Sequence, residues 1–284
     1  MNNKNRAVRW GAVAWVLLCV AAVWMRGVQW DETYEHAQVI TGQVQYPDGH
    51  PLLRYCHTAY SVQTMLSVLM LKAGLGPLAI CGFRNLLVLL ASVLPVFLLT
   101  TLLTRRALWG HVAAMLMLAG VYLAFDGSYP LMVWPSLYSN GHIGGGMALI
   151  IVYLLLAGHI RAGFLLAGLM PMIHAGEAPP VLGIAALMAG WLWWRGEKKA
   201  ALQGVVFGAT GFLLTAAFFV VASSQSLPAP TSGPYYSAID PQAVWAGYTT
   251  LHDIHRRFPP MNGQIILIGT LVLTAAAAWR ERNA

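Results

Sequence analysis

The sequence has little charge for its length. Of its 284 residues only 10% are Asp, Glu, Lys or Arg, whereas a soluble globular domain carries about 25%. Apolar residues make up 58% of the chain. These proportions exclude an ordinary soluble domain and predict an all-α polytopic membrane protein, residues 1–284 forming a single membrane domain. Its net charge of +7 is interpreted as membrane topology, and no nucleic-acid partner is expected.

Cysteine is also scarce. The three cysteines, Cys19, Cys56 and Cys81, are odd in number and have neither metal-binding nor redox spacing. This excludes a disulfide framework and predicts free thiols, with a single Cys56–Cys81 bridge as the alternative. A glycine-rich phosphate loop is missing as well, so a soluble nucleotide substrate is not expected.

Long apolar runs are abundant. A hydrocarbon core needs about 20 apolar residues per helix. The first run follows Lys4, Arg6 and Arg9 and is not followed by a small-residue cleavage site, which predicts a retained signal anchor. Prolines flank the junction of the fifth and sixth runs, which predicts broken helices there. The pattern predicts about eight transmembrane helices, at residues 8–25, 85–104, 107–125, 141–158, 162–175, 179–195, 200–223 and 263–279.

Basic residues recur at every second connection between these spans. The positive-inside rule therefore predicts an inner or plasma membrane protein with both termini in the cytoplasm. Two long external segments follow, 26–84 and 224–262. Counting 58–80 as a span would reverse every later connection, so this stretch is expected to be a helix in the outer interface. The predicted cytoplasmic cations are Arg105, Arg106, Arg161, Arg195, Lys198, Lys199, Arg280 and Arg282.

Residues 29–60 concentrate the titratable groups of this sparsely charged chain. Asp31 and Glu32 are adjacent, and neighbouring carboxylates repel, so one is expected to keep a proton or share a cation. That suits a general base or a ligand of a divalent cation, and the sequence identifies no other cofactor. The alternative is an acidic helix start that favours the macrodipole.

Several basic residues are candidates for holding an anionic substrate on the same face. His50 and Arg54 lie in a turn-rich stretch, where Asp48 either sets the turn or takes part in function. Arg84 is expected at the outer end of the second span, where it either reaches lipid headgroups or binds the substrate.

The remaining candidates lie later in the chain. His142 starts a glycine-rich span, while His174 and Glu177 lie at the predicted break, where they either bond to each other or line the cavity of Asp31. The last external segment offers phosphate or metal ligands, with lipid headgroups as the alternative partners. Its candidates are His252, His255, Arg256 and Arg257.

These motifs resemble the GT-C superfamily of membrane glycosyltransferases that use polyprenyl-phosphate sugars. A cytoplasmic N-terminus, one span and an external loop opening with Asp31-Glu32 are similar to that family. His50-Pro51-Leu52 is similar to the His-Pro-Pro-Leu element of its protein mannosyltransferase and aminoarabinose transferase branches, with Leu52 replacing the second proline. Arg84 corresponds to an arginine opening the second span, and the break at His174 is similar to one in bacterial members.

The resemblance implies a transferase that moves a sugar from a polyprenyl-phosphate donor to a glycan, lipid or protein acceptor on the non-cytoplasmic face of the membrane. Asp31 would be the catalytic base or ligand, with Glu32 assisting, and Arg256 or Arg257 would hold the lipid phosphate. Two other classes stay open. One is a non-catalytic transporter or envelope-complex partner, and the other is a membrane peptidase with Cys56 or Cys81 as nucleophile.

Overall fold

The computed structural model describes residues 3–45, 56, 60–123 and 140–224, and this part of the chain is helical. Four stretches are long and apolar enough to cross a membrane: Ala7–Arg26, Pro77–Thr104, Ala175–Trp194 and Lys198–Ser224. Four shorter apolar helices lie between them, at Val62–Lys72, Ala107–Gly120, Gly141–Leu156 and Ile160–Ile173, and residues 263–279 lie outside the described residues. The all-helical fold is therefore confirmed for this part of the chain, four stretches of which could cross a membrane, and the count of about eight spans stays a prediction.

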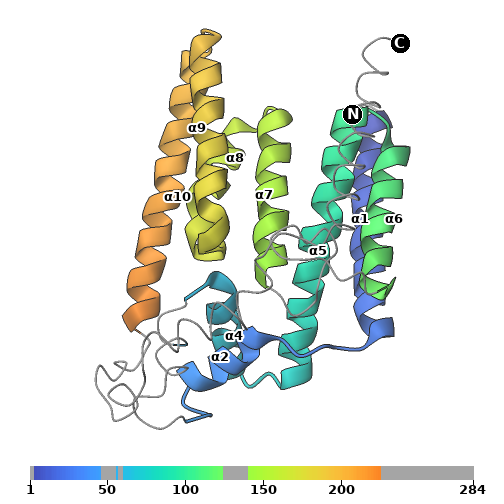
Figure 1. Ribbon diagram of the computed structural model, residues 1–284, viewed down its shortest axis with the longest axis vertical. Helices are drawn as coiled ribbons and strands as arrows, with labels where there is room; N and C mark the ends of the chain where they lie inside the picture. The colour runs from blue at the N-terminus through green and yellow to red at the C-terminus, as the bar shows by residue number, and fades with distance from the viewer. Residues whose placement is uncertain (1–2, 46–55, 57–59, 124–139, 225–284) are drawn as a thin grey trace, which may run out of the picture.

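Figure 1 shows most of these helices side by side as a bundle, with two short helices at one end. The elements in chain order are α1 (Asn3–Arg26), α2 (Glu32–Ile40), α4 (Val62–Lys72), α5 (Pro77–Thr104), α6 (Ala107–Leu123), α7 (Asn140–Leu156), α8 (Ile160–Ile173), the 3₁₀ turn η1 (Ala175–Glu177), α9 (Ala178–Trp194) and α10 (Lys198–Ser224).

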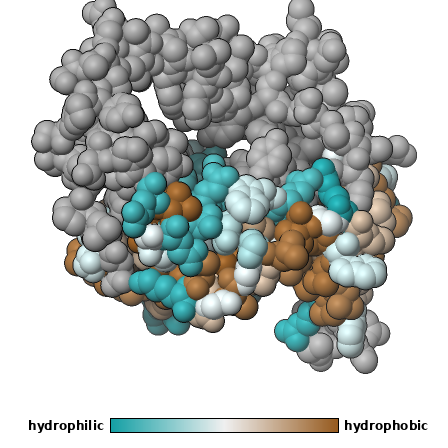
Figure 2. Space-filling model, turned by 90° about the horizontal axis from the view of Figure 1, so that it is seen from below, coloured by the Kyte–Doolittle hydropathy of each residue, from teal (hydrophilic) through white to brown (hydrophobic). Residues whose placement is uncertain are grey.

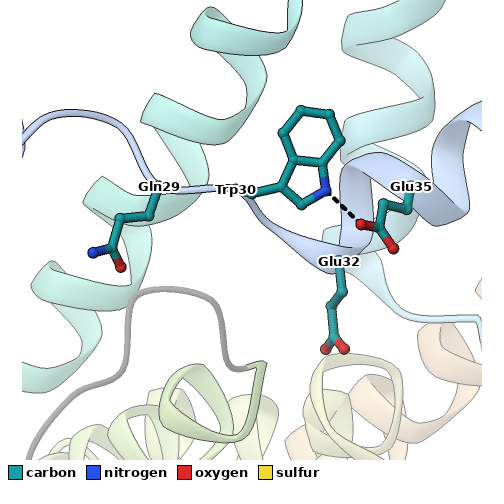
Figure 3. A pocket seen from close by; sticks show the side chains of 4 residues that line it. All are labelled: Gln29, Trp30, Glu32 and Glu35. Carbon is teal, nitrogen blue, oxygen red and sulfur yellow. Dashed lines mark hydrogen bonds between the residues drawn. The ribbon is translucent and has the colours of Figure 1, made fainter.

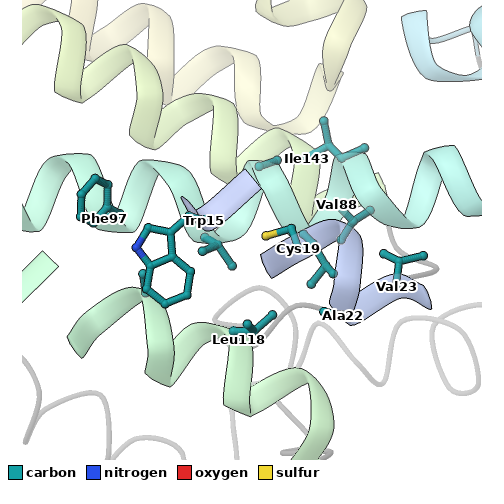
Figure 4. Packing of buried hydrophobic residues seen from close by; sticks show 12 residues of the cluster. Trp15, Cys19, Ala22, Val23, Val88, Phe97, Leu118 and Ile143 are labelled. Carbon is teal, nitrogen blue, oxygen red and sulfur yellow. The ribbon is translucent and has the colours of Figure 1, made fainter. Parts of the chain in front are cut away.

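An apolar cluster holds α1, α5, α6 and the start of α7 together. Trp15 and Cys19 of α1 pack there with Val88 and Phe97 of α5 and Ile143 of α7 (Figure 4). A second cluster joins α7, α8 and α9. Lipid tails are as apolar as these side chains, so burial of apolar surface does not by itself drive such helices together in a membrane. Their contact depends instead on close packing.

Glycines provide that close packing between neighbouring helices. A Cβ at Gly146 of α7 would collide with the backbone carbonyl of Ala91 in α5. A Cβ at Gly168 of α8 would collide with the carbonyl of Gly208 in α10. The two interfaces therefore bring backbones together at positions that tolerate no side chain.

The second spanning helix starts earlier than the predicted residue 85. It begins at Pro77, after the extended Gly76, because proline at the first helical position has a preset φ and needs no hydrogen-bond donor. Arg84 therefore lies about two turns inside α5 and does not open it. The predicted 58–80 helix is divided, since α4 ends at Lys72 and Gly74 turns the chain with φ +81.

The short helices and the basic turns occupy opposite ends of the bundle. In Figure 1, α2 and α4 lie at the lower end, and Figure 2 looks onto this end, where described hydrophilic and apolar residues alternate on the surface. The α5–α6, α7–α8 and α9–α10 turns lie at the upper end with the start of α1. The predicted cytoplasmic cations Arg105, Arg161 and Arg195 thus share one end, and the side of the membrane that this end faces stays a prediction.

Candidate functional site

Asp31 begins α2 and caps its N-terminus. It is extended, and its Oδ1 accepts a hydrogen bond from the backbone N–H of Thr33 at 2.8 Å. Aspartate is among the preferred residues at this position because its carboxylate satisfies an unpaired helical N–H. Glu32 and Glu35 occupy the first turn, where negative charge favours the helix dipole. The sequence allowed these acids to be either a functional site or simply an acidic helix start. The local structure agrees with an acidic helix start.

Asp31 also forms a buried ion pair with Arg84. The Arg84 Nε lies 3.5 Å from Asp31 Oδ1, and both side chains have an exposed fraction of 0%. A buried charge is costly unless it is paired and hydrogen-bonded. Both side chains therefore lie in the interior of the protein, and a role for Arg84 in binding lipid headgroups or a substrate stays a prediction.

The hydroxyl of Thr33 joins three helices. It bonds to Asp31 Oδ1, lies 3.1 Å from Arg84 Nε, and lies 2.9 Å from the hydroxyl of Ser67. A hydroxyl has one proton and two acceptor lone pairs. Since the Asp31 carboxylate only accepts and Arg84 only donates, Thr33 donates to Asp31 and accepts from both Arg84 and Ser67. This arrangement fixes α2, α4 and α5 relative to one another.

Further buried polar atoms lie near this end of the bundle. Asp31 Oδ2, both amide atoms of Gln63 and His142 Nε2 have no hydrogen-bond partner among the described residues. Gln63 is one turn from Ser67, so the two share a face of α4. Buried polar groups are usually satisfied, and unsatisfied ones call for a functional or structural explanation.

An open hollow of about 410 Å³ lies beside this network, lined by Gln29, Trp30, Glu32 and Glu35 (Figure 3). Trp30 Nε1 donates to Glu35 Oε1 at 2.5 Å, and its ring meets Tyr34 edge-on with centroids 5.0 Å apart. In Figure 3 the side chain of Glu32 points away from this pair. Glu32 and Glu35 are both exposed, so the hollow presents carboxylates beside an indole that is 53% exposed.

The segment that leads into the hollow is fixed to α5. The backbone N–H of Gln29 donates to Asn85 Oδ1 at 2.7 Å, and Asn85 is fully buried. His36, one turn beyond Glu32 on α2, is half-buried. Burial lowers the pKa of His36 below its ordinary value of 6.5, although the nearby charges of Glu35 and Asp31 act in the opposite direction.

The predicted break between the fifth and sixth spans is present as η1. The backbone N–H of Glu177 donates to His174 Nδ1 at 3.2 Å. The expected bond between these residues therefore involves the Glu177 backbone and not its carboxylate. Gly144 of α7 packs against His174, since a Cβ there would lie 2.7 Å from the His174 side chain. Whether His174 also lines the cavity of Asp31 stays a prediction.

Some of the other predicted site residues are described by the structure and some are not. His142 is half-buried in the first turn of α7.

The three cysteines are buried free thiols, so the alternative Cys56–Cys81 bridge is not formed. Within the described residues no group of three or more His, Cys, Asp or Glu could hold a metal ion, and the divalent cation stays a prediction. Six candidates lie outside the described residues: His50, Arg54, His252, His255, Arg256 and Arg257.

Sequence reasoning missed Thr33, Gln63 and Ser67. The available signal was the run of polar residues Gln63, Thr64 and Ser67 inside an otherwise apolar helix, where Gln63 and Ser67 share one face. A polar helix face in an apolar segment predicts a buried polar partner. The partner itself, Thr33, lies more than thirty residues away in sequence and could be found only from the packing.

No protein-family model, curated protein or solved structure matches this chain.

Proposed function

We propose that the protein is a GT-C-like glycosyltransferase that moves a sugar from a polyprenyl-phosphate donor to an acceptor on the non-cytoplasmic face. The observation that carries this proposal is the separation of the acidic pair. Asp31 is buried against Arg84, while Glu32 is exposed in an open hollow beside Trp30. This hollow lies at the end of the bundle opposite the basic turns, where a lipid-linked substrate on the outer leaflet would be within reach.

Two residues of the hollow, Glu32 and Trp30, have roles that fit their positions. Glu32 accepts the proton of the acceptor hydroxyl, since its carboxylate is exposed to the hollow. The exposed face of Trp30 supports the apolar face of a sugar ring, as aromatic side chains provide both apolar area and a fixed geometry. Asp31, which the sequence suggested as the base, is here a positioning residue with Arg84, because both are buried and paired with each other.

The reaction balances as a simple displacement. The acceptor oxygen forms a bond to the anomeric carbon and loses its proton to Glu32, while the bond from that carbon to the phosphate oxygen breaks. The polyprenyl phosphate leaves as an anion, and cationic donors aimed at its oxygens would lower the barrier. Arg256 and Arg257 remain the residues proposed for that role.

The direct test is Glu32→Gln, which keeps the side-chain size and removes the base. With purified protein in proteoliposomes and a labelled polyprenyl-phosphate sugar, transfer is expected to fall by about 100-fold or more. Glu197→Gln is the matched control, since Glu197 is an exposed glutamate at the opposite end of the bundle. Unchanged transfer by the Glu32 variant would contradict the assignment, and absence of transfer by the wild-type protein with any such donor would contradict the function.

A transporter or envelope-complex partner is the second candidate, and the interrupted α8–η1–α9 segment favours it. Pro171 lies inside α8, and prolines at the start of α9 follow η1, a pattern typical of substrate paths. Uptake of a labelled lipid-linked sugar without transfer would support a transporter.

A cysteine peptidase with Cys56 as nucleophile is disfavoured, because Cys56 is buried and burial raises the pKa of its thiol, which makes it a weak nucleophile.

A further inference from the structure

The α9–α10 turn gathers tryptophans and cations at the end opposite the acidic hollow. Arg195 lies over the ring of Trp191, 4.9 Å from its centroid, and Lys198 lies 5.3 Å from the centroid of Trp193. Trp194, which directly precedes Arg195, is 83% exposed. Cations held against indole faces keep their N–H groups directed outward, where they can donate to an anion.

The neighbouring helix α8 adds a further cation to this group. Arg161 donates to Gln203 of α10 at 3.2 Å and lies 5.9 Å from the ring centroid of Phe207. We define the basic patch as Arg161, Arg195, Lys198 and Lys199, all of which are exposed. The one acid in this turn, Glu197, lies 3.9 Å from Arg195 with both side chains half exposed, so their mutual attraction is weak.

Exposed apolar side chains continue from the basic patch along α9 and α10. Leu187, Leu202 and Val206 each expose more than half of their surface. A surface that is cationic at one end and aliphatic along its length matches an anionic phospholipid, whose phosphate meets the cations while its acyl chains follow the helices. A soluble phosphorylated ligand or a nucleic acid would leave this aliphatic surface without a partner.

We propose that the basic patch is a binding site for an anionic phospholipid of the leaflet at that end. The indoles of Trp191 and Trp193 orient Arg195 and Lys198 toward the lipid phosphate, and Arg161 and Lys199 add positive charge beside them. This site is independent of the proposed transferase activity, since it lies at the opposite end of the bundle (Figure 1).

The test places the protein in nanodiscs that contain equal amounts of phosphatidylglycerol and phosphatidylcholine with the same acyl chains. Native mass spectrometry then measures the lipids that stay bound. The wild-type protein is expected to retain phosphatidylglycerol in excess of the nanodisc ratio by about fivefold or more, the effect of one cation near an anionic surface. The triple variant Arg195→Gln, Lys198→Gln, Lys199→Gln is expected to return to the nanodisc ratio.

Lys72→Gln is the matched control, because Lys72 is an exposed lysine on α4 at the other end. This variant is expected to retain phosphatidylglycerol like the wild type. Retention at the nanodisc ratio by the wild type, or full enrichment by the triple variant, would overturn the proposal. If the triple variant loses its helical circular dichroism, Lys198→Gln alone replaces it, and its enrichment is expected to lie between that of the wild type and the nanodisc ratio.

Discussion

At the residue scale, the buried polar network sets the position of the hollow. Thr33 links Asp31, Arg84 and Ser67 through one hydroxyl, and Glu32 lies between Asp31 and Thr33 in the chain. Any shift of this network would therefore move the carboxylate proposed to act on the substrate. The stability of the network should be measurable separately from activity.

Asp31→Ala is expected to destabilise the protein by about 3–5 kcal/mol, because it leaves Arg84 buried without its counter-charge. Combining Asp31→Leu with Arg84→Met removes both charges, and this double variant is expected to be more stable than Asp31→Ala. Thermal unfolding in detergent measures both effects, with Glu197→Ala as the exposed control. Equal losses for the single and double variants would show that the pair is not coupled.

His36 is expected to make the stability of the folded protein depend on pH. Burial lowers the pKa of His36 in the folded protein, so the unfolded chain binds a proton more readily. The contribution of His36 to stability is therefore complete above its ordinary pKa of 6.5 and is lost as the pH falls from that value toward the lower folded pKa. Unfolding temperatures between about pH 7.5 and about pH 5.5 should fall less for His36→Gln than for the wild type. Identical pH profiles would contradict this account.

At the scale of elements, the length of the apolar runs predicts the position of several helices but not the contacts between them. The predicted spans at 107–125, 141–158 and 200–223 match α6, α7 and α10 closely. The sequence predicts the start of α5 at residue 85, because a charged residue such as Arg84 is expected at the end of a membrane helix. In the structure Arg84 lies inside the helix, where it is paired with Asp31. That pairing joins residues 53 positions apart, and no periodicity connects them.

The candidate site was predicted in part for the same reason. Crowding of charge in 29–60 points to the start of α2, where Asp31 pairs with Arg84 and Glu32 lines the hollow, while a role for either in function stays a prediction. Sequence alone could not assign one carboxylate to the interior and the other to the surface. That distinction comes from which side of α2 packs against α4 and α5.

Glycine contacts between helices give a prediction at this scale. Gly146→Ala is expected to destabilise the bundle by about 1–3 kcal/mol, because the new methyl group would collide with the Ala91 carbonyl and force α5 and α7 apart. Gly145→Ala is the matched control in the same helix, since nothing lies within 4 Å of a Cβ there. Its effect is expected to be neutral or stabilising by about 0.4–1 kcal/mol. Thermal unfolding of both variants compares them, and equal effects would contradict the close α5–α7 contact.

At the scale of the whole molecule, charge is divided between the two ends of the bundle. The cations of the α5–α6, α7–α8 and α9–α10 turns lie at one end, and the carboxylates of α2 lie at the other. The positive-inside rule then predicts that the hollow faces away from the cytoplasm. The proposed function requires this orientation, since a lipid-linked sugar and its acceptor would meet on the outer face.

Transfer in sealed vesicles of known orientation tests this account most directly. A labelled polyprenyl-phosphate sugar is added to the membrane, and a membrane-impermeant acceptor is supplied outside the vesicles. We predict product with right-side-out vesicles, little product with inverted ones, and a loss of about 100-fold for Glu32→Gln in the active orientation. Product formed equally in both orientations, or only in inverted vesicles, would contradict the claim that the acidic hollow is an external active site.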